Sequence, residues 1–200
     1  MYKGNSSRIV PIIVVLIVIA IAVVILVSVG RALFGGNDQS SQVETDSSRQ
    51  ALLNTSLDHS VRMTVRGPIV ANEDFRSYQI TVSSDSRNLS VYKGYLGQVI
   101  SSKQFSNNTQ AYEQFVYALD KANLAAGTEL PDDSDDTRGI CATGSLYEFE
   151  IMNGETAEER LWTSTCKGSR GSLKASVTQV QNLFLQQIPD SNDLLDEVNL

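Results

Sequence analysis

Histidine and cysteine are scarce in this sequence, which limits the chemistry that it could perform. The chain of 200 residues contains one histidine, His59, and two cysteines, Cys141 and Cys166. A zinc site normally takes three or four ligands, mostly from these residue types. A catalytic triad would have to use His59, yet no Gly-x-Ser-x-Gly sequence presents a serine as its nucleophile. We therefore expect no catalytic residue, metal site or cofactor, and we expect His59 to lie on the surface.

Basic residues are also few. The chain has 16 lysines and arginines against 23 aspartates and glutamates, which gives a net charge of -7. Three of the bases, Lys3, Arg8 and Arg31, lie in the first 36 residues, which contain no acid. The rest of the chain therefore has 13 bases against 23 acids, a net charge of -10. Because binding to a phosphate backbone needs clustered basic side chains, nucleic acid is not an expected partner.

One long uncharged run lies near the N-terminus. From Ile9 to Val29 there are 21 residues without a charge, most of them Ile, Val, Leu or Ala. As a helix this run would be about 31 Å long, close to the hydrocarbon thickness of a bilayer. We predict a single transmembrane helix over residues 9–30 that anchors the chain. Residues 1–8 are expected in the cytoplasm because Lys3 and Arg8 precede the run, and the C-terminal part is expected outside the cell membrane. A cleaved signal peptide, usually shorter in its apolar core, is the alternative.

The rest of the chain divides into a linker, one domain and a tail. Residues 31–58 are rich in Ser, Gln, Asn and Asp, which predicts a flexible linker, with a possible short helix from Ser48 onward. Residues 59–189 are long enough for one extracytoplasmic domain with a modest core. Residues 190–200 form an acidic C-terminal tail.

Alternation of apolar and polar residues predicts strands in both halves of the domain. Val61, Met63 and Val65 alternate with polar residues, as in a half-buried strand that ends before Gly67. The same period predicts an antiparallel hairpin with a polar turn around residues 84–88. The remaining strands are expected over residues 78–82, 89–91, 99–105, 147–152 and 161–166, with a turn at 153–154 before the last.

Apolar residues at helical spacing predict two helices. Asn107 is the expected N-cap of the first, with Gln110 completing a capping box. Ser176 and Gln179 have the same roles in the second helix, which ends at Pro189. The buried stripes are Tyr112, Phe115, Val116 and Leu119 in the first helix, and Val177, Val180, Leu183, Phe184 and Ile188 in the second.

These elements predict an α+β fold. Neither a sheet nor an amphipathic helix can bury its apolar side alone, so we expect two layers. The fold class is an antiparallel sheet with two amphipathic helices packed on one face, preceded by one N-terminal transmembrane helix.

The two cysteines are expected to form a disulfide. If Phe149 lies opposite Trp162 across the turn, Cys141 and Cys166 come close to each other, and the segment is expected to be exported, where disulfides persist. A redox-active or nucleophilic cysteine is the alternative, but the sequence contains no Cys-x-x-Cys pair.

Acidic residues cluster in two places. The run from Asp132 to Asp136 lacks the spacing of an EF-hand loop, so a solvated loop is favoured over a calcium site. Glu148 and Glu150 alternate with apolar residues, which places them on the solvent face of a strand rather than in an acid–base pair. Glu155, Glu158 and Glu159 follow the predicted turn.

Three segments resemble a known group of proteins. They are VRMTVRGPIV from residue 61, GICATGSLY from residue 139 and LWTSTC from residue 161. They are similar to an uncharacterised group of small, membrane-anchored extracytoplasmic proteins from ultrasmall, host-dependent bacteria. The resemblance covers most of the domain. It implies a location but no activity and no site residues.

The leading functional hypothesis is a membrane-tethered extracytoplasmic interaction or structural module at the cell surface, with an unidentified protein partner. A cell-surface hydrolase that uses carboxylates is one alternative. The other is a protease-inhibitor-like domain that inserts an exposed loop, such as Asn153 to Glu159, into a foreign active site.

Overall fold

Alternating burial along the strands builds a single sheet. The computed structural model describes residues 47–131, 133–169 and 171–196, all within one unit, residues 43–200. On strand β1 (His59–Arg66), Val61, Met63 and Val65 are buried, whereas Arg62 and Thr64 between them are half-exposed. The other strands are β2 (Arg76–Ser83), β3 (Ser86–Lys93), β4 (Gln98–Ser106), β5 (Leu146–Asn153) and β6 (Thr156–Ser164).

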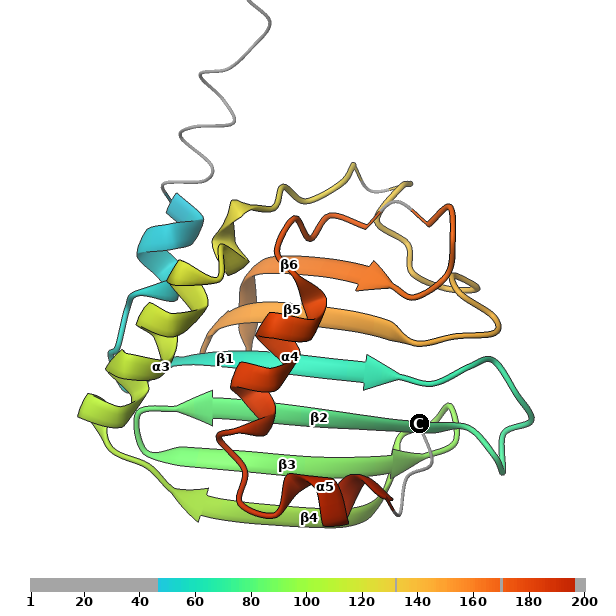
Figure 1. Cartoon of the computed structure of the whole chain (residues 1–200), viewed down its shortest axis with the longest axis horizontal. Helices are drawn as coiled ribbons and strands as arrows, with labels where there is room; N and C mark the ends of the chain where they lie inside the picture. Colours follow the sequence, from blue (N-terminus) through green and yellow to red (C-terminus); the bar gives the residue numbers. More distant parts are fainter. Residues whose placement is uncertain (1–46, 132, 170, 197–200) are drawn as a thin grey trace, which may run out of the picture. The chain divides into compact units, whose positions relative to one another are not determined.

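The six strands lie in the order β4-β3-β2-β1-β5-β6, and every neighbouring pair is antiparallel (Figure 1). β1 to β4 form a meander, and the β5–β6 hairpin adds to the free side of β1. The long connection between β4 and β5 contains the main helix. This arrangement confirms the predicted α+β fold with an antiparallel sheet.

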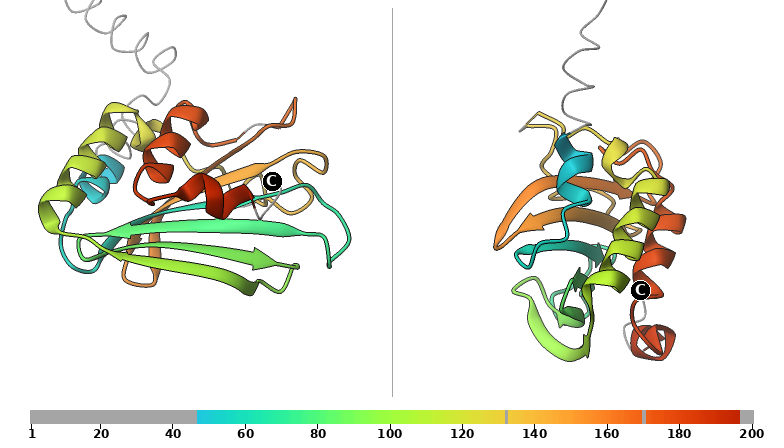
Figure 2. Two further views of the ribbon diagram at one scale, coloured as in Figure 1. Left: turned by 60° about the horizontal axis from the view of Figure 1, so that its bottom comes forward. Right: turned by 90° about the vertical axis from the view of Figure 1, so that its left-hand side faces the viewer.

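The helices lie together on one face of the sheet (Figure 2). They are α3 (Thr109–Lys121), the short 3-10 turn η1 (Leu124–Ala126), α4 (Val177–Leu185) and α5 (Ser191–Asp196). The stripe predicted for the first helix is buried in α3, and Val180 and Phe184 are buried in α4. Phe184 contacts Phe115 and Phe149, with ring centroids 5.2 Å and 6.0 Å apart, and so joins both helices to the sheet.

Two helix caps test the predicted boundaries. Ser176 caps α4 as expected, because its side chain accepts a hydrogen bond from the Gln179 N–H. The prediction of Asn107 as the cap of α3 is wrong by one residue: Asn108 accepts from the Ala111 N–H. The Asn107 side chain instead donates to the Ser83 carbonyl at 2.6 Å, so it ties the end of β4 to the β2–β3 turn.

The predicted pairing of Phe149 with Trp162 is also wrong by one residue. Phe149 lies opposite Leu161, and Trp162 lies opposite Glu148. A β-bulge between Ile151 and Met152 shifts the register of this hairpin, which the turn position alone does not indicate.

A short helix over residues 47–52 leads into β1. Leu52 is fully buried in the core, and Arg49 forms an ion pair with Asp120 of α3 at 2.6 Å. Within the described ranges, no helix combines the length and apolar character needed to cross a bilayer. The membrane span predicted for residues 9–30 lies outside the described residues.

Candidate functional site

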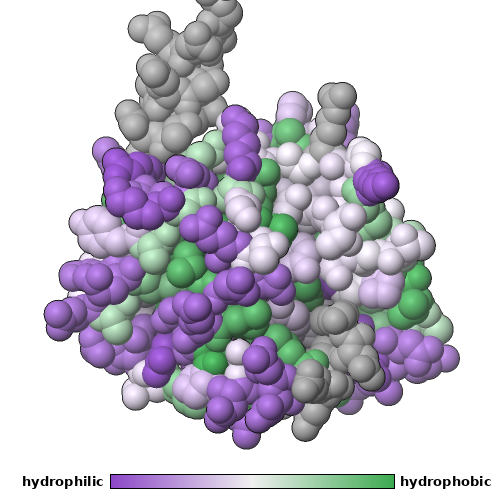
Figure 3. Space-filling model, viewed as in Figure 1, coloured by the Kyte–Doolittle hydropathy of each residue, from purple (hydrophilic) through white to green (hydrophobic). Residues whose placement is uncertain are grey.

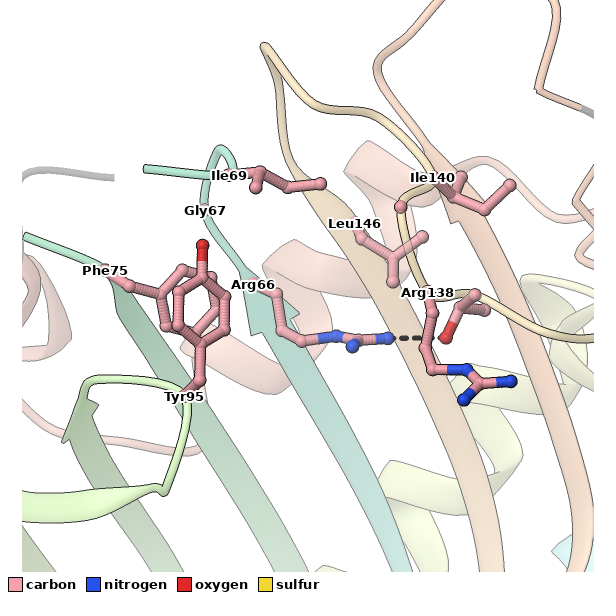
Figure 4. A pocket seen from close by; sticks show the side chains of 10 residues that line it. Arg66, Gly67, Ile69, Phe75, Tyr95, Arg138, Ile140 and Leu146 are labelled. Atoms are coloured by element: carbon pink, nitrogen blue, oxygen red, sulfur yellow. Dashed lines mark hydrogen bonds between the residues drawn. The ribbon is translucent and has the colours of Figure 1, made fainter. Parts of the chain in front are cut away.

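One pocket lies where three loops meet at one end of the sheet. It encloses about 360 Å³ and is formed by the β1–β2 loop, the β3–β4 turn and the segment before β5. We call this region, residues 67–75, 94–97 and 137–145, the loop end. Figure 4 shows Phe75 and Tyr95 on one side of the pocket and Ile140 on the other, with Arg66 between them. The lining residues are Arg66, Gly67, Ile69, Phe75, Tyr95, Thr137, Arg138, Gly139, Ile140 and Leu146.

One wall of the pocket is held by Tyr95. Its ring stacks on Phe75, and its hydroxyl donates to the Val70 carbonyl at 2.7 Å. Its backbone N–H donates to the Asn72 side chain at 3.0 Å. The preceding Gly94 has φ +71, and a Cβ atom there would lie 2.9 Å from Asn72 Oδ1, so a glycine is needed for this close approach. The β1–β2 loop and the β3–β4 turn therefore form one connected wall.

Two arginines lie at the pocket in different states. Arg66 donates to Thr137 Oγ1 at 2.6 Å, and its Nη2 lies 2.8 Å from Glu148 Oε2, so its charge is largely balanced. Arg138 is exposed and, among the described residues, pairs only with Asp136, at 2.6 Å. Hydrogen bonds from Arg138 lower the pKa of Asp136 to about 2, which keeps this carboxylate ionised. The exposed Arg138–Asp136 pair is the polar group that a ligand could reach most easily.

An ion-pair network supports the pocket from behind. Glu148 accepts hydrogen bonds from Arg160 of β6 and pairs with Arg66 of β1. Asp135 accepts from Arg160 and, at 2.7 Å, from the indole N–H of buried Trp162. The prediction that the run from Asp132 to Asp136 is simply a solvated loop is therefore wrong for Asp135, which fixes this loop onto the outer face of the sheet.

The predicted disulfide is present and anchors the third loop of the pocket. Cys141 and Cys166 are bonded, with their Cα atoms 5.1 Å apart and a sequence separation of 25. Gly144 packs against this bridge, because a Cβ there would lie 2.9 Å from Cys141 Sγ. Arg138 and Ile140 lie in the segment before β5, and the bridge attaches this segment to the chain just after β6.

Apolar side chains are exposed mainly at the loop end. Among the described residues, the exposed large hydrophobics number eight, and six of them lie in or beside its loops. Leu96, at the tip of the β3–β4 turn, is 99% exposed. In Figure 3, hydrophobic residues also show at the right-hand margin, where Figure 1 places the β1–β2 loop. The six are Ile69, Val70, Tyr95, Leu96, Val99 and Ile100. Such a grouping is typical of an interaction surface.

The prediction that His59 lies on the surface is wrong. It is only 8% exposed, and its ring lies between Ser56 Oγ at 2.8 Å from Nδ1 and Asn54 Nδ2 at 3.0 Å from Nε2. Glu158 Oε2 is 3.8 Å from Nε2. The structure therefore brings a serine, a histidine and a carboxylate together, although the sequence indicated no such group.

The proton arrangement argues against a catalytic role for this group. The Ser56 N–H donates to Asn54 Oδ1, which fixes the Asn54 amide so that its NH₂ group donates to His59 Nε2. Nε2 is then unprotonated, and Nδ1 carries the proton that is donated to Ser56 Oγ. A histidine that donates to a serine cannot also accept the proton of that serine, so His59 cannot be the general base for Ser56.

A second, smaller pocket contains a buried carboxyl group. It encloses about 240 Å³ and is lined by residues 47–48, residues 127–129, Glu158 and Glu159. Glu159 is 5% exposed, and burial raises its pKa to about 7, helped by the nearby Glu129 charge and opposed by a hydrogen bond from Ser48. Glu129 itself accepts from the Arg160 N–H at 2.6 Å. In the parts of the chain that the structure describes, no group of three His, Cys, Asp or Glu residues could hold a metal ion.

The segment considered as an inhibitory loop lies mostly in a strand. β6 begins at Thr156, so Asn153 to Glu159 is a tight turn followed by sheet rather than a long exposed loop. In comparisons with known proteins, no family model matches the sequence, and no curated protein matches it. The function is therefore argued from the surface and pockets described above.

Proposed function

We propose that this chain is a membrane-tethered extracytoplasmic interaction module that binds a protein partner at the cell surface through its loop end. The observation that carries the proposal is the grouping of six exposed hydrophobic residues around the pocket at the loop end. A partner would bury Leu96 and its neighbours, and the exposed Arg138–Asp136 pair would lie at the polar rim of the contact.

The proposed tether is the apolar run of residues 9–30, with the N-terminus in the cytoplasm. The described domain begins at residue 47, at the end of the sheet opposite the loop end (Figure 1). The acidic composition of the C-terminal part supports a protein partner rather than nucleic acid.

Site-specific photo-crosslinking in the cells that produce the protein tests this proposal. A photoreactive phenylalanine analogue replaces Leu96 in one variant and Leu57 in a matched control. Leu57 is also exposed, at 79%, but it precedes β1 at the opposite end of the sheet. A discrete crosslinked species from position 96 alone supports the proposal. Equal crosslinking from both positions, or none from position 96, would overturn it.

One observation favours a second candidate, a cell-surface hydrolase. Glu159 has a pKa of about 7 and lies in a pocket with Glu129 and Glu158, and a general acid needs such a raised pKa. Against this role, Glu159 Oε2 is buried and has no hydrogen-bond partner among the described residues. Hydrolysis of cell-wall or peptide substrates that Glu159→Gln abolishes would favour the hydrolase.

A further inference from the structure

The two edge strands of the sheet, β6 and β4, differ in how many of their outward main-chain groups are hydrogen-bonded. On β6, the Arg160 N–H donates to Glu129 at 2.6 Å and the Trp162 N–H donates to Ser172 Oγ at 2.9 Å. The Trp162 carbonyl accepts from the Leu173 N–H at 3.0 Å. A side chain or a neighbouring segment therefore occupies the outward main-chain groups of Trp162 and the outward N–H of Arg160, so the middle of β6 is closed to another strand.

The opposite edge, β4, is open. Apart from its pairing with β3, the β4 main chain makes one further contact within the described ranges, from the Arg87 side chain to the Ser106 carbonyl. Seven of its nine residues are exposed, including Val99 and Ile100. Lys103 is its only charged residue. A long edge strand with unpaired N–H and C=O groups is a template for another strand.

The apolar surface of the loop end continues onto this edge. The cross-strand neighbours Arg66, Ser77, Tyr92 and Val99 form one row across the sheet. Arg66 lines the large pocket, and Val99 is on the edge strand. Ser77 in this row is buried, so the exposed connection runs through the β3–β4 turn, where exposed Tyr95 and Leu96 are followed by exposed Val99 and Ile100 of β4. A partner that covers Leu96 therefore lies beside the first residues of the open edge.

Charge indicates what kind of strand this edge accepts. Residues 86–106, which form β3, β4 and the turn between them, contain the basic residues Arg87, Lys93 and Lys103 and no acidic residue, whereas residues 107–200 contain six basic and sixteen acidic ones. The local charge around β4 is therefore positive in an otherwise acidic protein. Antiparallel pairing of β4 with the β4 of a second copy would bring two Lys103 side chains and their basic neighbours together, which is unfavourable. An added strand with carboxylate side chains would be attracted instead.

We propose that an extended segment of a protein partner, carrying both apolar and acidic residues, adds to the sheet as a strand beside β4. Its main chain bonds to the free N–H and C=O groups of β4. Its apolar side chains cover Val99 and Ile100, and a carboxylate pairs with Lys103. This inference rests on the proposed interaction function and names the form of the partner.

A random dodecapeptide display library, selected against the full-length protein in detergent micelles, supplies the probe. Enriched peptides that alternate apolar residues with Asp or Glu are the expected result. The best of them is then synthesised, and hydrogen exchange of the protein is measured with and without it. We expect slower exchange across residues 98–106, because the outward amides of β4 become hydrogen-bonded.

Two sets of variants separate strand addition from simple surface contact. Lys103→Glu should weaken binding of the enriched peptide about tenfold, the effect of roughly 1.4 kcal/mol. Lys174→Glu is its matched control, because Lys174 is exposed beside the closed β6 edge. Ser101→Pro and Ser102→Pro each remove one β4 amide, and adjacent amides point to opposite sides of a strand. The substitution that removes the N–H bonded to β3 should lower the melting temperature. The substitution that removes the outward N–H should keep the wild-type melting temperature, and this variant should lose peptide binding.

The outcomes distinguish this inference from the proposed function. If enriched peptides slow exchange in residues 67–75 and 94–97 but leave β4 unchanged, the interaction function stands and strand addition is overturned. If no peptide is enriched, the result counts against both. If β4 is already protected in the free protein, its edge is occupied by a second copy or by another part of the same chain, and the inference fails.

Discussion

The ring of Tyr95 stacks on the ring of Phe75, with centroids 4.2 Å apart and an angle of 18° between the planes. Phe75 precedes β2, and Tyr95 lies in the turn between β3 and β4, so the contact joins two loops that are 20 residues apart in sequence. The Tyr95 hydroxyl adds a hydrogen bond to the Val70 carbonyl and one from the Val70 N–H. This one side chain therefore holds one wall of the large pocket in place.

Replacing Tyr95 by phenylalanine tests this role. Tyr95→Phe keeps the stacked ring but removes both hydrogen bonds to Val70, so we expect a loss of about 1 kcal/mol in the free energy of unfolding. The amide of Val70 should exchange faster with solvent. Tyr117→Phe is the control, because Tyr117 is similarly exposed on α3 and far from the loop end. Unchanged exchange at Val70 in Tyr95→Phe would show that the loop is held by other contacts.

Removing the disulfide should loosen the opposite wall of the pocket. The bridge closes a loop with a sequence separation of 25 residues, and the double variant Cys141→Ser/Cys166→Ser should lose roughly 3 kcal/mol of stability. Thermal unfolding can be followed through the fluorescence of Trp162, the only tryptophan in the chain. Reduction of the wild-type protein serves as the control and should lower the melting temperature by a similar amount. A drop in the serine variant without a drop on reduction would mean that the serine side chains, rather than the lost bridge, cause the effect.

The shared carboxylate of Glu148 should contribute more than its neighbour Glu150. Glu148 is 13% exposed and pairs with both Arg66 and Arg160, whereas Glu150 pairs with Arg62 at 3.5 Å. Glu148→Gln leaves two partly buried arginines without their common partner, so we expect a loss of about 2 kcal/mol. Glu150→Gln should cost less than about 1 kcal/mol. Urea unfolding of both variants measures the difference, and equal losses would contradict the assigned network.

The elements of the fold were predictable where burial follows a simple period. The alternation of Val61, Met63 and Val65 identified β1, and the apolar stripe that contains Phe115 identified α3, because each pattern reports directly on which side of an element faces the core. Boundaries were less certain, since Asn107 and Asn108 are both good caps and only the tertiary contact of Asn107 with Ser83 separates them.

The sites were not predictable to the same extent, because they depend on contacts between distant segments. The pocket joins Ile69, Tyr95 and Ile140 from three loops, and no local pattern relates these positions. His59 is surrounded by polar residues in sequence, yet the turn at Ser56 folds back over its ring and buries it. The bulge after Ile151 likewise shifts the register of β6, so the strand positions of Glu158 and Glu159 could not be counted from the turn.

Glu159 should make the stability of the domain depend on pH. Burial raises its pKa from an ordinary value of 4.5 to about 7, so the folded protein holds a proton that the unfolded chain releases. The stabilising effect of this proton is fully present below about pH 4.5 and is lost as the pH rises through about 7, because the folded state then binds no more protons than the unfolded state. Above that pH the ionised, buried carboxylate costs up to roughly 3 kcal/mol relative to a neutral group.

Glu159→Gln should therefore be more stable than the wild type at pH 8 and similar to it at pH 5. Glu155→Gln is the control, since Glu155 is exposed in the β5–β6 turn and should leave the pH profile unchanged. Thermal unfolding between pH 5 and pH 8 gives the profiles, and a wild-type curve parallel to that of Glu159→Gln would show that Glu159 ionises in the folded protein as it does in the unfolded chain.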